Sequence, residues 1–339
     1  MPAQKQRYTI RDVAAKAQVS ISTVSRYLNQ SGYVDPGTAR RIAKTIHQID
    51  YTPSIAASSL KSQKSRIVLL VVPDICNPFY SDMAKNVQAL LSQRGYVMAL
   101  FDSFESQNEL MAITLAKQMY ASGILLGSIN INPEVISALQ NTNISVVCLN
   151  AYEQYPFDTV HVQGTEGMYI ATQHLLSLGH QKIGFAGGTP HTMIEKSRRA
   201  GYERALGEAG LVLQPENIVE IGFSQSDGYE AGLYFATKAD LPTAICCAND
   251  QIALGLLSAM NEKGIHVPSR VSVTGMDNIP YAQTSNPGLT SITNDSRKFS
   301  EEGVRLLFDR IDRLYNGPPR EVAISHELIL RGSSASPFR

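Results

Sequence analysis

A short polar stretch near the N-terminus carries the side chains best suited to contact nucleic-acid bases. Between Ser20 and Asn29, small polar residues surround the apolar positions Val24 and Leu28, and one arginine, Arg26, lies towards the end. Small side chains let a helix approach the floor of the major groove, and one arginine can donate two hydrogen bonds to guanine. The residues expected on the outward face of such a helix are Ile21, Ser22, Ser25, Arg26 and Asn29.

Two helices and a turn are expected to position this face. Thr9 can cap a first helix, with Asp12 in the place of the usual Glu or Gln of a capping box. Gln18 and Val19 predict a turn, after which Ser20 can cap the second helix. This spacing indicates a helix-turn-helix, although an ordinary helical hairpin shows the same pattern. The apolar residues expected to face inward are Ile10, Val13, Ala14, Ala17, Val24 and Leu28.

A third helix is expected to complete the head. Asp35 can cap it, and Pro36 suits its first position, where the missing N–H costs nothing. Ile42, Ile46 and Ile49 would supply its buried side. A core of this size is marginal by itself, which indicates that DNA or a dimer partner helps to order it.

The net charge of zero conceals an uneven distribution of charge along the chain. Residues 1–66 contain 11 Lys and Arg against 3 Asp and Glu, whereas the remainder contains 19 basic and 27 acidic residues. A basic head on an acidic body predicts a polyanionic partner for the head alone. Because the basic region coincides with the helix-turn-helix pattern, the partner we expect is nucleic acid.

A Ser-rich segment follows the head, and two interpretations of it remain open. Its composition and its length of under three turns are typical of a flexible linker. Alternatively, it becomes helical on DNA, where two copies from a homodimer would pack in the minor groove with Leu60 as an apolar wedge between base steps. The domains we expect are a helix-turn-helix head at residues 1–52, a hinge or linker at 53–65, and a ligand-binding body at 66–339.

From Arg66 onward, apolar runs alternate with helical patterns. Ile67–Val72 is a continuous apolar run, which is typical of a strand buried on both faces. Two series of strands and helices predict an α/β fold with two doubly wound parallel-sheet lobes, like those of periplasmic binding proteins, and a ligand cleft at the carboxyl ends of the strands. We expect the first lobe to comprise about 66–160 with 295–320, and the second about 163–291 with 321–332.

The motifs of common enzymes and metal sites are absent from the sequence. Gly187-Gly188-Thr189 lacks the Gly-Lys-Ser/Thr ending of a phosphate-binding loop, and the histidines lack metal-ligand spacing with partners. We therefore expect neither catalysis nor a metal or cofactor.

The cysteines and the N-terminus predict the compartment. No disulfide framework or Cys-x-x-Cys spacing occurs, so we expect buried, reduced thiols. The polar N-terminus and the absence of a long apolar run predict a cytoplasmic protein with no membrane span. The cysteines are Cys76, Cys148, Cys246 and Cys247.

Short strings of residues in the head and body follow one another in a characteristic order. In the head they are Thr9-Ile10-Arg11-Asp12-Val13-Ala14, Val19-Ser20, Thr23-Val24-Ser25-Arg26, Tyr51-x-Pro53 and Leu60. In the body they are Pro73-Asp74, Asn77-Pro78-Phe79, His174-Leu175, Gly179-His180, Arg198, Gly201-Tyr202, Ala248-Asn249-Asp250-Gln251-Ile252-Ala253 and Gly275-Met276-Asp277-Asn278. With these strings the chain resembles, over nearly its whole length, the lactose-repressor/galactose-repressor family of bacterial transcription regulators.

The resemblance implies roles for particular residues. In the head, Ile21, Ser22 and Arg26 would contact the major groove and Leu60 the minor groove. The full set of expected DNA contacts is Thr9, Ser20, Ile21, Ser22, Thr23, Ser25, Arg26, Asn29, Tyr51 and Leu60. The expected effector contacts are Phe79, Tyr80, Arg198, Phe223, Asn249 and Asp277. Rings can stack on the apolar face of a sugar while the polar side chains bond its hydroxyls, although core packing or a structural ion pair would also explain them.

The function we expect is that of a ligand-responsive repressor of carbohydrate-utilisation genes, acting as a homodimer. A sugar or sugar phosphate in the cleft would change its affinity for double-stranded operator DNA. Alternatives within the same architecture are a catabolite-control-type regulator with a phosphoprotein co-effector and a purine-responsive repressor. A solute-binding protein shares the two-lobed body but has no use for a basic helical head.

Overall fold

The computed structural model describes residues 8–29, 31–52, 65–103, 108–127, 131–149, 155–162 and 164–337. The chain divides into two compact units with separate hydrophobic cores, Met1–Ser65 and Arg66–Arg339. Within the described residues, we find no helix that is both long and apolar enough to cross a membrane.

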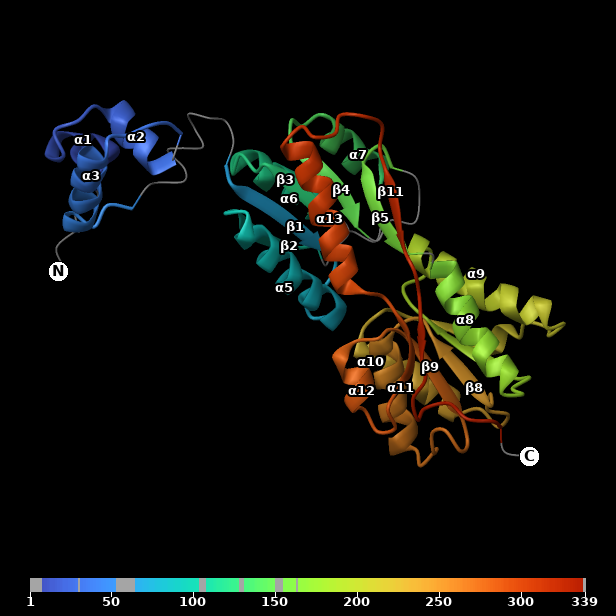
Figure 1. Cartoon of the computed structure of the whole chain (residues 1–339). Helices are drawn as coiled ribbons and strands as arrows, with labels where there is room; N and C mark the ends of the chain where they lie inside the picture. The colour runs from blue at the N-terminus through green and yellow to red at the C-terminus, as the bar shows by residue number, and fades with distance from the viewer. Residues whose placement is uncertain are drawn as a thin grey trace. The chain divides into compact units, whose positions relative to one another are not determined.

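Three helices form the head (Figure 1): α1 (Ile10–Lys16), α2 (Ile21–Asn29) and α3 (Pro36–Gln48). The apolar positions predicted to face inward on the first two helices meet in one core, so that prediction is confirmed. The buried members of this core are Val13, Ala14, Ala17, Val24, Ile42 and Ile49, and Ile10, Leu28 and Ile46 pack against it.

Side chains fix where these helices begin. Ser20 Oγ accepts the backbone N–H three residues on at 3.1 Å, and Asp35 Oδ2 does the same at 3.0 Å, which confirms both predicted caps. At α1, Asp12 accepts the backbone N–H of Thr9 at 2.7 Å and its hydroxyl at 2.8 Å. These hydrogen bonds lower the pKa of the Asp12 carboxyl.

A six-stranded parallel sheet forms the first lobe of the body. Side chains of its strand β1 (Ile67–Val72) pack alternately into two hydrophobic clusters, one on each side of the sheet, which confirms the predicted burial on both faces. Helices α5 (Pro78–Gln93) and α13 (Ser296–Ile311) cover one face. Helices α6 (Asn108–Gln118) and α7 (Pro133–Gln140) cover the other. The sheet order is β11-β5-β4-β3-β1-β2, with β2 (Val97–Asp102), β3 (Gly123–Leu126), β4 (Ser145–Leu149), β5 (Asp158–Val162) and β11 (Glu321–Ile324).

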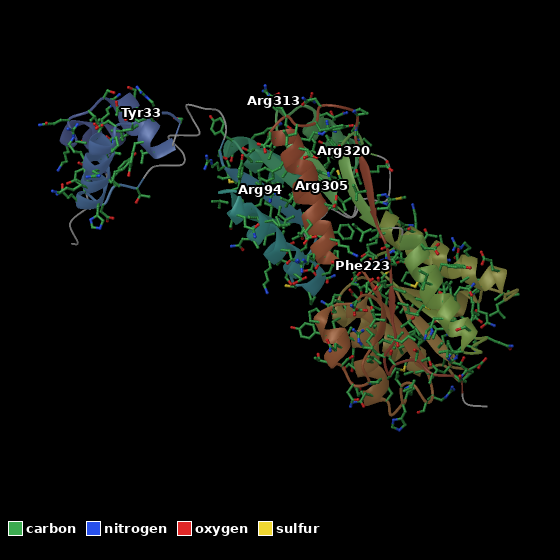
Figure 2. All side chains as sticks on the ribbon, viewed as in Figure 1. Tyr33, Arg94, Phe223, Arg305, Arg313 and Arg320 are labelled. Carbon is green, nitrogen blue, oxygen red and sulfur yellow. The ribbon has the colours of Figure 1, made fainter. Side chains whose placement is uncertain are left out.

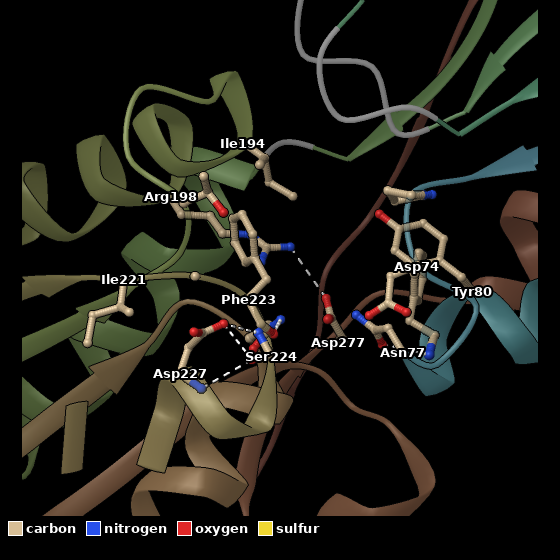
Figure 3. Close-up of a pocket in the computed structure, with 15 residues that line it drawn as sticks. Asp74, Asn77, Tyr80, Ile194, Arg198, Ile221, Phe223, Ser224, Asp227 and Asp277 are labelled. Atoms are coloured by element: carbon tan, nitrogen blue, oxygen red, sulfur yellow. Dashed lines mark hydrogen bonds and ion pairs between the residues drawn. The ribbon is translucent and has the colours of Figure 1, made fainter. Parts of the chain in front are cut away.

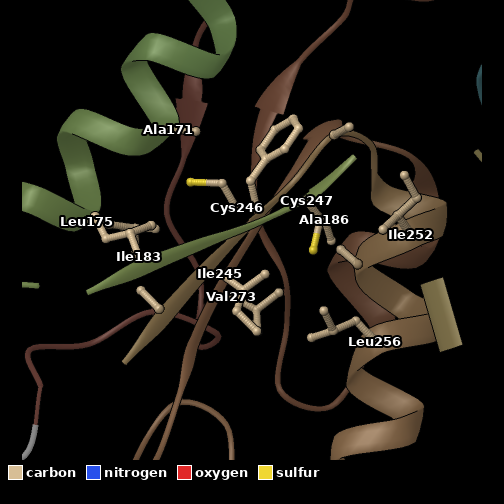
Figure 4. Packing of buried hydrophobic residues seen from close by; sticks show 14 of the residues in the cluster. Ala171, Leu175, Ile183, Ala186, Ile245, Cys246, Cys247, Ile252, Leu256 and Val273 are labelled. Atoms are coloured by element: carbon tan, nitrogen blue, oxygen red, sulfur yellow. The ribbon is translucent and has the colours of Figure 1, made fainter. Parts of the chain in front are cut away.

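The second lobe contains another six-stranded sheet, in the order β12-β10-β9-β8-β6-β7. Its pairings are parallel except that β12 (Leu328–Ile329) runs antiparallel to β10 (Thr290–Thr293). Figure 4 shows the packed core, with α8 (Gly164–Ser177) and α11 (Asp250–Glu262) on opposite sides of the sheet. The other strands are β6 (Ile183–Gly187), β7 (Ile218–Glu220), β8 (Ala244–Cys247) and β9 (Ser272–Asp277). The helices are α8 (Gly164–Ser177), α9 (Met193–Glu208), the 3-10 turn Pro215–Asn217, α10 (Gln225–Ala236), α11 (Asp250–Glu262) and α12 (Pro280–Thr284).

The placement of β11 corrects the predicted lobe boundaries. We expected residues 321–332 in the second lobe, but β11 pairs with β5 of the first lobe, with Val322 opposite Val160. Only β12 joins the second sheet. The physical reason is an ion pair next to β11, because Arg320 Nη2 lies 2.8 Å from Asp158 Oδ2 on β5. The chain therefore passes between the lobes after β5, after β10 and after β11.

The position of Cys76 is a second correction. We expected all four cysteines to be buried, and Cys148, Cys246 and Cys247 are, but Cys76 is exposed. It lies in the loop between β1 and α5, where its N–H donates to Asp74 Oδ1 at 2.8 Å. An apolar neighbourhood in the sequence did not indicate burial here because the segment turns at the surface.

Glycines let neighbouring helices of the second lobe approach closely. A Cβ added to Gly228 of α10 would collide with the carbonyl oxygen of Ile252 on α11, and one added to Gly255 of α11 would collide with that of Gln225 on α10. Gly201 of α9 meets the backbone of α8 in the same way. Because these contacts are backbone to backbone, neither helix of a pair can shift without the other.

Replacing Gly255 with Ala should therefore lower the free energy of unfolding by about 1–3 kcal/mol, the usual range for overpacking. Gly207→Ala in α9 is the matched control, since a Cβ there meets no atom within 4 Å. The control should leave stability unchanged or raise it by up to about 1 kcal/mol through helix propensity. Urea denaturation of both variants measures the difference, and equal values would contradict the close packing.

Candidate effector site and DNA-contact surface

A cavity of about 450 Å³ lies between the two lobes of the body, at the carboxyl ends of strands from both sheets (Figure 3). This is where ligands of doubly wound sheets bind. All six residues predicted to contact the effector line it, so the structure brings the whole predicted set together. The lining residues are Pro73, Asp74, Asn77, Phe79 and Tyr80 from the first lobe, and Thr189, Ile194, Arg198, Ile221, Gly222, Phe223, Ser224, Asp227, Asn249 and Asp277 from the second.

Arg198, on α9, is a buried cation in the cavity wall. Its Nη1 donates to the carbonyl oxygen of Ala248 at 2.7 Å, and its Nη2 approaches Asp277 Oδ1 at 3.4 Å. The ring centroid of Phe223 lies 5.8 Å from the guanidinium carbon. The side chains of Arg198 and Asp277 are only 3% and 5% exposed. Removing two charges from water is costly, so such a pair persists only where further hydrogen bonds support it.

Asp277 ends β9 in a backbone conformation that L-residues rarely adopt, with φ at 106°. Its Oδ1 also accepts a hydrogen bond from Asn294 Nδ2 at 2.6 Å. Burial raises the pKa of the Asp277 carboxyl, while Arg198 and Asn294 oppose that shift. Strained residues of this kind are concentrated at ligand sites, where the surrounding structure enforces them.

Asn249 has a structural role besides its place in the cavity wall. Its Oδ1 accepts the N–H of Ile252 at 2.8 Å and so caps α11. Its Nδ2 donates to the carbonyl oxygen of Phe223 at 3.0 Å. The amide thus ties the start of α11 to the segment after β7, and any ligand contact it makes must share these bonds.

Aromatic rings form the apolar walls of the cavity. Phe79 and Tyr80 begin α5 with their ring centroids 5.0 Å apart, and Phe79 also meets Phe299 edge to face at 5.9 Å. Both cavity rings are largely buried, so Phe79 and Tyr80 belong to the first-lobe core as well as to the site. Phe223 lies between the lobes (Figure 2) and packs directly against Gly188, where any Cβ would collide with its ring.

Several cavity residues were not predicted from the sequence as site residues. They follow the ends of β1, β6 and β7, which is where the rule for parallel sheets places a ligand site. That rule identifies segments, however, and not which of their side chains face inward. The residues missed are Pro73, Asp74, Asn77, Thr189, Ile194, Ile221, Gly222, Ser224 and Asp227.

Two carboxyl groups lie side by side behind the Phe223 wall. Glu195, on α9, is 1% exposed, and its Oε2 accepts the N–H of Gly188 at 2.5 Å. A Cβ on Gly187 would collide with the side chains of both Glu195 and Glu220, so the two converge at this glycine. Burial raises the pKa of Glu195 to about 7, and the charge of Glu220 adds to the shift. Arg199 balances Glu220, with Nη1 3.1 Å from its Oε1.

The predicted DNA contacts of the head lie on and around α2. Ile21 is 46% exposed, so its side chain is accessible on this helix. Ser22 and Arg26 are also exposed, on the same helix. Ser20 Oγ lies 2.7 Å from Ser22 Oγ and 2.8 Å from Thr23 Oγ1, so hydroxyl groups cluster at the start of α2.

The remaining predicted contacts differ in their surroundings. Thr9 is exposed and Ser25 partly exposed. Tyr51 packs against the head core, and burial raises the pKa of its hydroxyl. The side chain of Asn29 and the whole of Leu60 lie outside the described residues.

Comparison with known proteins identifies both parts of the chain. Residues 9–54 match the family described as bacterial regulatory proteins, lacI family, and residues 172–334 match the periplasmic binding protein-like domain. The chain is 31% identical over 335 residues to the HTH-type transcriptional repressor PurR of Haemophilus influenzae, covering 97% of this chain and 99% of that one. It is also 31% identical over 338 residues to the HTH-type transcriptional repressor CytR of Escherichia coli, covering 98% and 99%.

Solved structures agree with the fold. The lac repressor dimer bound to operator and the anti-inducer ONPF superimposes with a TM-score of 0.86 at 24% identity, over 97% of this chain and 100% of that one. The complex of the transcriptional regulator CelR with cellobiose gives a TM-score of 0.73 at 26% identity, over 96% and 100%.

A helix-turn-helix head followed by two α/β lobes that share a cavity defines the class of ligand-responsive, DNA-binding transcription regulators. The chain belongs to the lacI family of bacterial regulatory proteins. It is therefore a regulator that binds operator DNA and a small-molecule effector, and not an enzyme.

The buried Glu195 gives stability a dependence on pH. In the unfolded chain this carboxyl ionises near its ordinary pKa of 4.5, whereas the folded protein keeps the proton until about pH 7. Between these values the folded state binds more protons, so the free energy of unfolding falls as pH rises. Glu195→Gln places a neutral side chain of similar shape at this position and should remove this fall. Between about pH 5 and about pH 8, the free energy of unfolding of the variant should come to exceed that of the unsubstituted protein by on the order of 1–3 kcal/mol.

Urea denaturation across this pH range measures the effect. Glu203→Gln is the control, because Glu203 is a more exposed carboxylate, 2.7 Å from the same Arg199. The control should follow the pH dependence of the unsubstituted protein. If Glu195→Gln followed it too, the buried neutral acid would be the wrong description.

Proposed function

We propose that this chain is a homodimeric repressor of carbohydrate-utilisation genes, whose operator affinity is changed by a sugar or sugar phosphate in the interlobe cavity. The observation that carries this proposal is the combination of aromatic walls with the buried Arg198–Asp277 pair in one cavity. Rings stack on the apolar face of a pyranose, while charged and amide groups bond its hydroxyls. The solved complex of the similar CelR with cellobiose supports a ligand of this kind.

The DNA-contacting end of the proposal rests on the exposed face of α2. Ile21, Ser22 and Arg26 are accessible there, within the part of the chain that carries an excess of positive charge. Two such heads in a dimer would bind half-sites about one helical turn apart on a pseudo-palindromic operator. The operator-bound dimer of the similar lac repressor supports this assembly. Insertion of Leu60 into the minor groove stays a prediction from the sequence.

The switch itself follows from the position of the cavity. Its walls come from both lobes, so a bound ligand favours one angle between the lobes over others. In the mechanism we propose, this change of angle releases the hinge segments and weakens operator binding. The energetic requirement is modest, because a coupling of about 1–3 kcal/mol changes affinity roughly 5–150-fold.

Arg26→Ala should weaken specific operator binding roughly 10- to 100-fold, because a bidentate contact to guanine contributes about 1–3 kcal/mol of discrimination. Lys44→Ala removes one exposed cation from α3 and serves as the control. It should reduce specific and non-specific binding by the same small factor. Gel shifts with operator and scrambled DNA measure both, and a loss for Arg26→Ala that is equal on the two DNAs would contradict base contact.

Asp277→Asn should abolish the effector response while sparing operator binding. The substitution keeps the size of the side chain but removes the charge that faces Arg198. Asp240→Asn, at an exposed position before β8, should respond as the unsubstituted protein does. Operator release is measured by gel shift against increasing effector. A normal response in Asp277→Asn would remove the cavity from the proposal.

A thermal-shift screen identifies the effector, because a ligand that binds only the folded state raises its melting temperature. Sugars, sugar phosphates and purines form the panel. Release of the operator by a sugar alone separates this function from the phosphoprotein-dependent alternative. Stabilisation by purines and by no sugar would replace the sugar effector with a purine.

A further inference from the structure

We propose that the effector is uncharged, and that the cavity excludes sugar phosphates and other anions. This inference rests on the proposed effector function of the cavity. The sequence left both sugars and sugar phosphates open as effectors. The uncharged class is favoured by the partners that the charged side chains around the cavity already have.

The charged side chains of the cavity are predominantly acidic. Among the described residues that line it, Arg198 is the only Lys or Arg, against the carboxylates of Asp74, Asp227 and Asp277. The guanidinium of Arg198 is held by the carbonyl oxygen of Ala248 at 2.7 Å and by Asp277 at 3.4 Å. A phosphate would therefore have to compete with a buried carboxylate for its counter-charge.

Helix N-termini, the other common phosphate sites, are occupied by their own side chains. Asn77 Oδ1 accepts an N–H of the first turn of α5 at 3.0 Å, and Asn249 Oδ1 accepts one of α11 at 2.8 Å. At α10, Ser224 Oγ accepts the N–H of Asp227 at 3.1 Å, and the Asp227 carboxylate accepts the N–H of Ser224 at 2.9 Å. The negative charge of Asp227 thus lies at the start of α10 and opposes the binding of an anion there.

The parts of the first lobe that lie outside the described residues contain no positively charged side chain. Residues 104–107, 128–130, 150–154 and 163 follow strands of the first lobe in the sequence. They contain no Lys or Arg and include Glu105 and Glu153. Whatever these segments contribute to the cavity, they contribute no cation.

An uncharged ligand meets none of these obstacles. The Arg198–Asp277 pair is neutral as a unit, so hydroxyl groups can hydrogen-bond to it without an added counter-charge. The rings of Tyr80 and Phe223 and the side chain of Ile194 offer apolar contact to the rest of the ligand. These features fit a neutral polyol with one apolar face.

Isothermal titration calorimetry of the full-length protein with matched ligand pairs tests the inference. Each pair consists of a neutral compound and its phosphate: ribose with ribose 5-phosphate, glucose with glucose 6-phosphate, fructose with fructose 6-phosphate, and adenosine with AMP. In the pair that binds, the neutral compound should bind at least roughly 100-fold more tightly, since burying an uncompensated anion is costly. Its Kd should also change little between low and high salt.

Asp74→Asn provides an internal check on the cause. It removes one carboxylate from the cavity, so the preference for the neutral compound should shrink roughly tenfold. Asp240→Asn makes the same chemical change at the opposite, amino-terminal edge of the second sheet and should leave the preference unchanged. Equal preferences in both variants would contradict an electrostatic cause.

The outcomes separate this inference from the function it rests on. A phosphorylated compound that binds as tightly as its neutral partner, or more tightly, overturns the inference and leaves the effector function standing. If no compound of any pair binds while operator binding persists, the sugar effector itself fails, and the inference fails with it.

Discussion

The burial of Arg198 against Asp277 is the interaction on which the ligand site depends. Neither charge could remain out of water alone, and each is held by a further partner, the carbonyl oxygen of Ala248 for one and Asn294 for the other. Arg198 lies on α9 and Asp277 on β9, while their partners Ala248 and Asn294 follow β8 and β10. The single pair therefore joins four segments of the second lobe. Removing one charge would leave the other buried and uncompensated, which typically costs about 3–5 kcal/mol.

This arrangement also connects the ligand site to the boundary between the lobes. Asn294, which bonds Asp277, lies between β10 and α13, where the chain passes from the second lobe to the first. A ligand that changes the hydrogen bonds of Asp277 therefore acts next to a segment that must bend when the lobes move. The helix pairs that pack through glycines beside the site resist internal deformation. A movement of the lobes therefore displaces these helices as whole units.

Much of this organisation could be predicted from the sequence because it rests on local rules. Ser20 and Asp35 cap helices where their types predict it, and the apolar run of β1 is buried on both faces. The sequence could not predict which lobe β11 joins, because a strand of four residues fits either sheet. Its place beside β5 depends on a partner distant in sequence, Asp158, which accepts the N–H of Arg320. The position of Asp227 in the cavity wall and the two hydrogen bonds of the Asn249 side-chain amide were not predicted either. They too depend on segments that only the folded chain brings together.

The surface loop between β1 and α5 has a practical consequence. Its Cys76 thiol is exposed and lies between two cavity residues, Asp74 and Asn77. The other three cysteines are buried, and burial raises the pKa of Cys148 to about 12 and that of Cys246 to about 11, which suppresses the reactive thiolate. The natural chain thus offers one exposed thiol, in a loop that also carries lining residues of the ligand cavity, where a fluorophore could be attached without introducing or removing any cysteine.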